Sequence, residues 1–128
     1  MDFSLPIEII EEIERFKRFV ETDLAADLKT WYRSRELPRT LFEKLGAGGW
    51  YGIRFENGRF AESSALREAL LTAELAKKSP GAAVAALAHA DLGLMGVLKY
   101  ASASLHARYG MAAVSGRTVM CLANTTHM

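Results

Sequence analysis

Residues 79–100 read SPGAAVAALAHADLGLMGVLKY, and this stretch decides the fold class. Ser79 is a residue type that often caps a helix at its N-terminus, and Pro80 suits the first helical turn. The residues that follow are apolar on almost every side of a helix, which predicts a central and buried helix. The sequence therefore predicts a helical protein built around this segment.

Helical periodicity continues on both sides of this stretch. Apolar residues recur every three or four positions from Ile9 to Trp31, which predicts one long helix or two stacked helices ending near Arg33. The run Thr118–Ala123 (TVMCLA) is β-branched and apolar, and it predicts one strand. The other helices are expected over residues 37–46 (with Gly46 as the stop), 63–78 and 102–114. The predicted fold is an all-α, up-and-down bundle of five or six helices with one short C-terminal strand.

The composition is that of an ordinary folded domain. The 128 residues include 16 Lys or Arg and 15 Asp or Glu, so the net charge of +1 argues against an electrostatic nucleic-acid binder. His89 and Asp91 interrupt the most apolar stretch, and the N-terminus lacks the pattern of a secretory signal. We therefore expect a cytoplasmic protein with no membrane-spanning segment.

The motifs that could carry chemistry are weak. The glycine-rich stretch 46–52 misses the spacing of a dinucleotide-binding loop and follows a predicted helix, so a plain turn is favoured. His89 and Asp91 lie on different faces of a helix and cannot form a base and its orienting partner, so His89 is expected to be a core or interface histidine. The single Cys121 is expected to be a buried structural thiol. No catalytic residue and no metal site is predicted.

Three phrases of the sequence resemble the N-terminal helical domain of acyl-CoA dehydrogenases. They are WYRSRELPRTLFEKLGAGGWYGIRF (31–55), ALREALLTAELAKKSPGAAVAALAHADLGLM (65–95) and HARYGMAAVSGRTVMCLANT (106–125), in that order. The resemblance covers essentially the whole chain. It implies that residues 1–117 form this helical domain and that 118–128 are the first strand of a middle β-domain, the rest of which is absent from this chain.

The resemblance also implies an activity. Family members are oxidoreductases that hold FAD between a middle and a C-terminal domain. A glutamate of the C-terminal domain removes the α-proton of an acyl thioester while the β-hydride passes to the flavin, and an electron-transfer flavoprotein takes the electrons. This chain would then be one part of an FAD-dependent acyl-CoA (or acyl-carrier-protein) dehydrogenase of fatty acid or polyketide metabolism. We expect it to be inactive without the remaining domains or a second subunit.

The resemblance assigns Val84, Ala88 and Leu92 to the wall of the acyl pocket. These residues are spaced i, i+4, i+8 on one helix face, and their apolar side chains suit an aliphatic acyl group. Simple packing of this face against another helix explains the same pattern equally well.

The end of the chain corresponds to the family's flavin-contacting phrase. Thr125 takes the flavin-contacting position, with Leu122 and Asn124 beside it, and these three residues are the expected FAD contacts. Thr126 and His127 stand where the family has glutamate and proline.

Two other functions remain open from the sequence. The chain could be a non-catalytic helical interaction module, or a truncated remnant. An unpaired terminal strand and an exposed pocket face would both favour self-association, so a homo-oligomer is expected.

Overall fold

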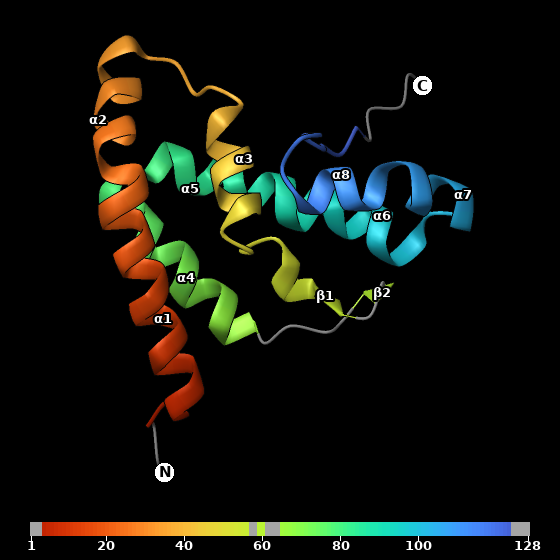
Figure 1. Ribbon diagram of the computed structural model, residues 1–128, viewed down its shortest axis with the longest axis horizontal. Coiled ribbons are helices and arrows are strands. Elements are labelled where there is room, and N and C mark those ends of the chain that lie inside the picture. Colours follow the sequence, from red (N-terminus) through yellow and green to blue (C-terminus); the bar gives the residue numbers. More distant parts are fainter. Residues whose placement is uncertain (1–3, 57–58, 61–64, 124–128) are drawn as a thin grey trace, which may run out of the picture. The chain divides into compact units, whose positions relative to one another are not determined.

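The structure is a computed structural model that describes residues 4–56, 59–60 and 65–123 (Figure 1). The chain divides into two compact units. Unit 1 comprises Met1–Pro38 and Ser63–Ala83, and unit 2 comprises Arg39–Glu62 and Val84–Met128. Helices dominate both units, which confirms the predicted all-α class.

Unit 1 contains a long helical run and a second helix packed against it. The run is continuous over the part that the periodicity predicts, although its middle turn is a π-helix. Helices α1 and α4 lie side by side (Figure 1). The elements of unit 1 are α1 (Ile7–Phe19), η1 (Val20–Leu24), α2 (Ala25–Ser34), α4 (Ala65–Lys78) and the beginning of α5 (Pro80–Leu87).

The core of unit 1 follows the helical spacing of the sequence. Its buried apolar residues recur at every fourth position along the first run, so one stripe of that run is buried, and α1 is the part of the run that packs against α4. Glu12 is also buried, and both of its carboxylate oxygens accept hydrogen bonds from the Arg67 guanidinium of α4. The buried apolar side chains are Phe16, Val20, Leu24, Leu28, Leu71, Leu75, Ala82 and Ala83.

Unit 2 is built from shorter elements. Two strands of two residues each form an antiparallel pair, with Phe55 opposite Phe60 and Glu56 opposite Arg59. Asn57 and Gly58, which follow Glu56 in the sequence, lie outside the described residues. The elements of unit 2 are α3 (Thr40–Ala47), η2 (Gly52–Arg54), β1 (Phe55–Glu56), β2 (Arg59–Phe60), η3 (Ala88–Leu94), α6 (Met95–Tyr100), α7 (Ala103–Leu105), η4 (His106–Gly110) and α8 (Met111–Val114).

The predicted terminal strand does not form over Thr118–Ala123, and this part of the prediction is wrong. A strand needs a neighbouring strand, and the described residues supply none here. The backbone N–H of Thr118 instead donates to the carbonyl of Ala112. Cys121 is exposed rather than buried, so the expectation of a buried thiol is wrong. We call Thr118–Ala123 the exit segment.

The helical run Pro80–Tyr100 is less buried than the sequence predicts. One side is covered, but Val84 is 67% exposed and Leu92 is 52% exposed. By length and composition alone this run could cross a membrane, a test that the core helix of a soluble protein also passes. A helix that is apolar all round needs neighbours on all sides to be buried. The described part of this chain covers only one part of its circumference.

Candidate functional site

His89 is the buried polar centre of unit 2. It lies on η3 with 1% of its surface exposed. Its Nδ1 atom lies 3.0 Å from the backbone nitrogen of Met120, and its Nε2 atom lies 3.1 Å from the carbonyl oxygen of Ala113. A backbone N–H can only donate and a carbonyl can only accept, so Nδ1 is the acceptor and Nε2 carries the hydrogen. The ring is therefore neutral and protonated on Nε2.

Two aromatic rings enclose the imidazole. Phe42 and Tyr51 meet it edge-on, with centroids 5.7 Å and 4.5 Å from its own. Desolvation by burial lowers the pKa of His89 below its ordinary 6.5, against the opposing effect of its two backbone hydrogen bonds. Burial likewise raises the pKa of the Tyr51 phenol, whose hydroxyl has no hydrogen-bond partner among the described residues. The expectation of a core histidine is confirmed, and a ring with both nitrogens engaged is not positioned to act as a base.

A glycine lets the exit segment lie directly on η3. Gly93 follows His89 by about one turn, and a Cβ atom there would stand 2.3 Å from the Cβ atom of Met120. It would also stand 2.5 Å from the carbonyl carbon of the same residue. His89 and Gly93 therefore both contact Met120. His89 accepts a hydrogen bond from its amide, and Gly93 lets its backbone approach closely.

The turn before the exit segment is fitted just as closely to α3. Gly116 has a φ of +74°, and a Cβ atom on it would lie 1.9 Å from the carbonyl oxygen of Phe42. A Cβ atom on Gly46 would lie 2.2 Å from the carbonyl of Ser115. The prediction that Gly46 ends its helix is wrong, because α3 continues to Ala47. Its role is to admit the neighbouring turn.

Asp91 has a different partner from His89, as the spacing predicts. The carboxylate of Asp91 forms an ion pair with Arg54, a buried residue at the end of η2. This pair ties the short helix before β1 to η3. His89 and Asp91 thus contribute to packing in two directions and share no proton-transfer geometry.

The three residues assigned to the acyl pocket lie on the partly exposed helix. Val84 and Leu92 are exposed, and Ala88 between them is half-buried. The structure leaves two large apolar side chains of this face in solvent. Their assignment to an acyl pocket stays a prediction.

The three residues assigned to the flavin lie at or beyond the end of the exit segment. Leu122 is 57% exposed, two residues after the amide that His89 binds. Asn124 and Thr125 lie outside the described residues. The flavin contacts therefore also stay a prediction.

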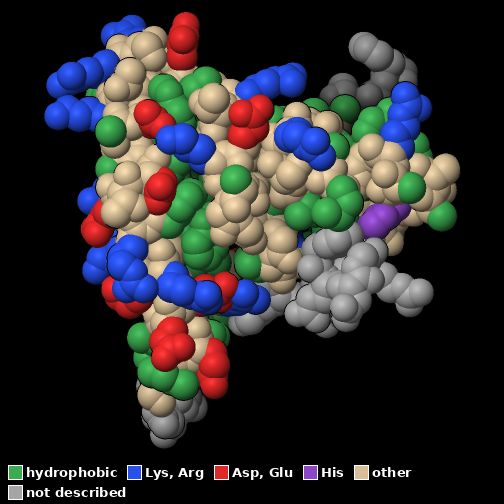
Figure 2. Space-filling model, viewed as in Figure 1, with side chains coloured by type: hydrophobic (Ala, Val, Ile, Leu, Met, Phe, Trp, Pro, Cys, Tyr) green, Lys and Arg blue, Asp and Glu red, His purple; other side chains and the backbone are tan. Residues whose placement is uncertain are grey.

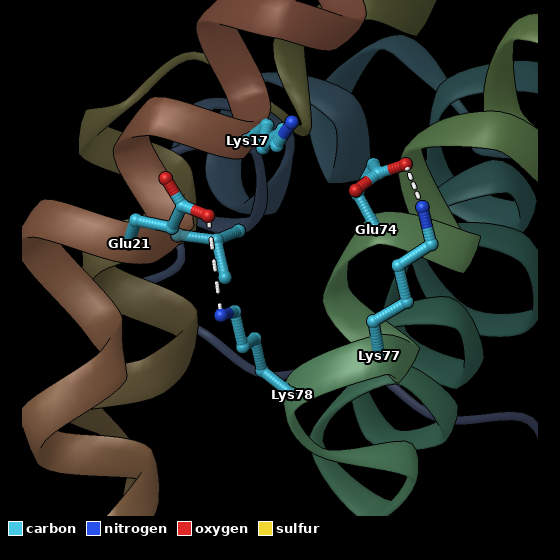
Figure 3. A pocket seen from close by; sticks show the side chains of 6 residues that line it. Lys17, Glu21, Glu74, Lys77 and Lys78 are labelled. Carbon is cyan, nitrogen blue, oxygen red and sulfur yellow. Dashed lines mark hydrogen bonds and ion pairs between the residues drawn. The ribbon is translucent and has the colours of Figure 1, made fainter.

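Unit 1 offers a groove between its two helices, but the groove is lined by compensating charges (Figure 3). Lys78 lies 3.9 Å from Glu21, and Lys77 forms an ion pair with Glu74. Lys17, on the rim, lies 4.0 Å from the carboxylate of Glu14 on its own helix.

Acidic and basic side chains are also interspersed over α1 and α2 (Figure 2). In the part of the chain that the structure describes, no group of three or more His, Cys, Asp or Glu residues could hold a metal ion. The groove of unit 1, as its described residues line it, therefore balances positive and negative charges and offers no single-sign site for an ionic ligand.

Sequence reasoning missed several residues of this site. Gly93 lies four positions after His89 in an apolar run, so the two residues share a helix face. This spacing is a sequence signal that could have identified Gly93 as part of the site. The partnership of Arg54 with Asp91 joins positions 37 apart, and the backbone amide of Met120 is contributed by every residue type. Neither of these has a sequence signal.

Comparisons with known proteins agree with one another. Residues 10–117 match a family model described as "Acyl-CoA dehydrogenase, N-terminal domain". The FAD complex of PigA is 25% identical with a TM-score of 0.81, over 93% of this chain and 32% of that chain. The apo form of PigA is matched over the same shares, also at 25% identity, with a TM-score of 0.79.

A third solved structure has the same fold. Glutaryl-CoA dehydrogenase from Mycobacterium smegmatis is 22% identical with a TM-score of 0.79, over 90% of this chain and 30% of that chain. The chain thus spans about a third of the length of the structures it matches. No curated protein matches it.

Proposed function

The chain belongs to the acyl-CoA dehydrogenase family, and on that premise we propose that it forms the N-terminal helical part of an FAD-dependent acyl-thioester dehydrogenase. The carrier of the acyl group is coenzyme A or an acyl-carrier protein. The observation that supports this most is the exposed apolar side of the run Pro80–Tyr100. The same run buries His89 and Leu94 in unit 2 but leaves Val84 and Leu92 in solvent.

An exposed apolar face of this kind is stabilised when a ligand or another domain covers it. Burying a Val or Leu side chain stabilises by about 1.5–3 kcal/mol, so covering two of them supplies a substantial part of a binding energy. Val84, Ala88 and Leu92 present methyl and methylene groups and no hydrogen-bonding side chain, which suits an aliphatic acyl chain. We assign this face to one wall of the acyl site.

The exit segment is suited to the edge of a flavin site. Leu122 is exposed and apolar, so it can lie against an aromatic ring system, and Asn124 and Thr125 follow it directly in the sequence. FAD, when bound, supplies the acceptor for the hydride. A relative of this fold has been solved as its FAD complex, which supports the same cofactor here.

The base that removes the α-proton lies elsewhere in this proposal. His89 uses both ring nitrogens in hydrogen bonds, and the pKa of its ring is lowered by burial. The remaining dehydrogenase domains, on a second subunit or a longer chain, would supply it. An electron-transfer flavoprotein, a homo-oligomeric assembly and a cytoplasmic location complete the proposal.

Complementation tests this function. The chain is co-expressed with the middle and C-terminal domains of a family member, and the purified complex is assayed for flavin absorbance and for dye reduction by acyl-CoA thioesters. We expect bound flavin and turnover with both parts, and no turnover by the 128-residue chain. A complex that forms but stays colourless would contradict the proposal.

A matched pair of variants tests the acyl wall. Leu92 and Leu105 are exposed to a similar extent, 52% and 48%, and both belong to unit 2. We expect Leu92→Asp to lower kcat/KM at least about tenfold, because a charge would enter an apolar wall. Leu105→Asp should leave it within about twofold. Equal effects of the two substitutions would remove the acyl-wall assignment.

A second function is favoured by the same exposed face and by the missing strand partner of the exit segment. The chain would then be a helical interaction module that associates with itself or caps another protein. Sedimentation distinguishes the two. A colourless homodimer that persists in the presence of the complementary domains supports the module, whereas a mixed flavin-containing complex supports the dehydrogenase.

A further inference from the structure

We propose that His89 is a positioning residue that fixes the course of the exit segment, and through it the position of Leu122, one of the residues assigned to the flavin. The flavin part of this inference rests on the proposed function. The course of the segment does not, and it can be tested on the chain by itself.

The bridge made by His89 joins three separate parts of unit 2. The ring is carried by η3, its Nε2–H donates to Ala113 at the end of α8, and its Nδ1 accepts from Met120 on the exit segment. A neutral imidazole has one donor and one acceptor, and both are used here in a buried setting. Losing either bond would leave a polar group without its partner.

Packing supports the same contact from two sides. The rings of Phe42 and Tyr51 hold the imidazole edge-on, which limits its rotation. Gly93 allows the backbone of Met120 to lie against η3, where any larger residue would push it away. The hydrogen bond is therefore formed between groups whose positions are already constrained.

Leu122 follows the anchored Met120 by only two residues, so the hydrogen bond to His89 also restricts the position of Leu122. The structure anchors the exit segment at two amides, Thr118 to Ala112 and Met120 to His89. Two residues of extended chain span at most about 7 Å, so Leu122 lies within that reach of the anchored amide. Without the bond to His89, the last anchored amide would be that of Thr118, two residues before Met120. Leu122 could then occupy a wider region.

Two amide variants separate the two ends of the bridge. The side-chain oxygen of Asn can occupy the place of Nδ1, so His89→Asn retains an acceptor for Met120 and loses the donor to Ala113. The longer Gln can place its NH₂ near Nε2, so His89→Gln retains the donor to Ala113 and loses the acceptor. Each variant keeps one bond, so a residue that only stabilises the fold would respond to both in the same way.

The first readout is amide hydrogen exchange of Met120 in the 128-residue chain. We expect His89→Asn to stay within about twofold of the parent chain and His89→Gln to exchange at least about fivefold faster, the size of one lost hydrogen bond. Equal acceleration in both variants would overturn the proposal. If neither variant folds, scalar coupling across the hydrogen bond between the Met120 amide and Nδ1 in the parent chain decides, and its absence would overturn the proposal.

The second readout is flavin affinity in the complex with the complementary domains. We expect His89→Gln to weaken flavin binding at least about fivefold and His89→Asn to leave it near the parent value. Equal affinities would refute the link to the flavin. A parent complex that binds no flavin would instead refute the proposed function, and Met120 exchange would still decide the course of the exit segment.

Discussion

Unit 1 and unit 2 are stabilised in different ways. In unit 1, a stripe of apolar residues at every fourth position, such as Val20 and Leu24, is buried along one side of the first helical run. In unit 2, Gly93 and Gly116 allow backbones to touch, and a buried histidine joins three elements. A stripe spreads its energy over many side chains, whereas a close approach depends on the one residue that permits it. Unit 2 should therefore be the more sensitive to single substitutions.

The largest effect is expected where a glycine touches another backbone. Gly116→Ala places a Cβ atom against the carbonyl of Phe42 and strains a positive φ, so we expect a loss of about 3–4 kcal/mol in the free energy of unfolding. Gly49 also has a positive φ, of +82°, but nothing lies within 4 Å of its Cβ position. Gly49→Ala should therefore cost about 1 kcal/mol. Urea unfolding measures both, and equal losses would contradict the close-packing explanation.

The buried ion pair of unit 1 is expected to have the next largest effect. Glu12→Ala leaves the Arg67 guanidinium without its partner, and because Arg67 retains some contact with solvent we expect a loss of about 1–2 kcal/mol. Glu14, on the same helix, pairs with Lys17 at the surface. Glu14→Ala should change the free energy of unfolding by less than about 0.5 kcal/mol. If the two variants behaved alike, the burial of Glu12 would have no energetic consequence.

The pH dependence of stability reports on His89. Its pKa is lowered in the folded protein, so the unfolded chain takes up the proton first as the pH falls below 6.5. The stability is then fully present above this value and declines as the pH falls towards the folded pKa. One proton limits the slope to about 1.4 kcal/mol per pH unit. Chemical unfolding at several pH values should show this decline in the parent chain and not in His89→Asn.

The smallest effect is expected in the groove of unit 1. Lys78 and Glu21 are both about half-exposed and lie 3.9 Å apart. Lys78→Met should change the free energy of unfolding by less than about 0.5 kcal/mol, and added salt should reduce the difference further. A loss above 1 kcal/mol that added salt diminishes would show that surface ion pairs do contribute to the stability of unit 1.

The elements that the sequence predicted correctly are those in which apolar residues repeat regularly. The run from Ile7 to Ser34 was predictable because a stripe of apolar residues repeats with the helical period. The N-cap of α5 was equally readable, since the Ser79 hydroxyl accepts a bond from the amide of Ala82. The terminal strand failed because strand formation depends on a partner that the described chain does not supply.

The candidate site was predictable only in part. His89 was expected in the core, but the partners of its two nitrogens are backbone groups, which have no signature in the sequence. The same limit applies to Gly46, where a helix stop and a close approach look alike until the neighbouring turn is known. Apolar periodicity also cannot tell an exposed helix face from one that is buried in the core, as the exposure of Val84 shows.

The most direct test of the proposed function is the visible absorbance spectrum of the tagged chain purified with its partners from the organism that produces it. We predict a yellow complex with a flavin spectrum, in which mass spectrometry finds the remaining dehydrogenase domains. A colourless chain associated only with itself would contradict this prediction. Membership of the family would then describe ancestry rather than activity.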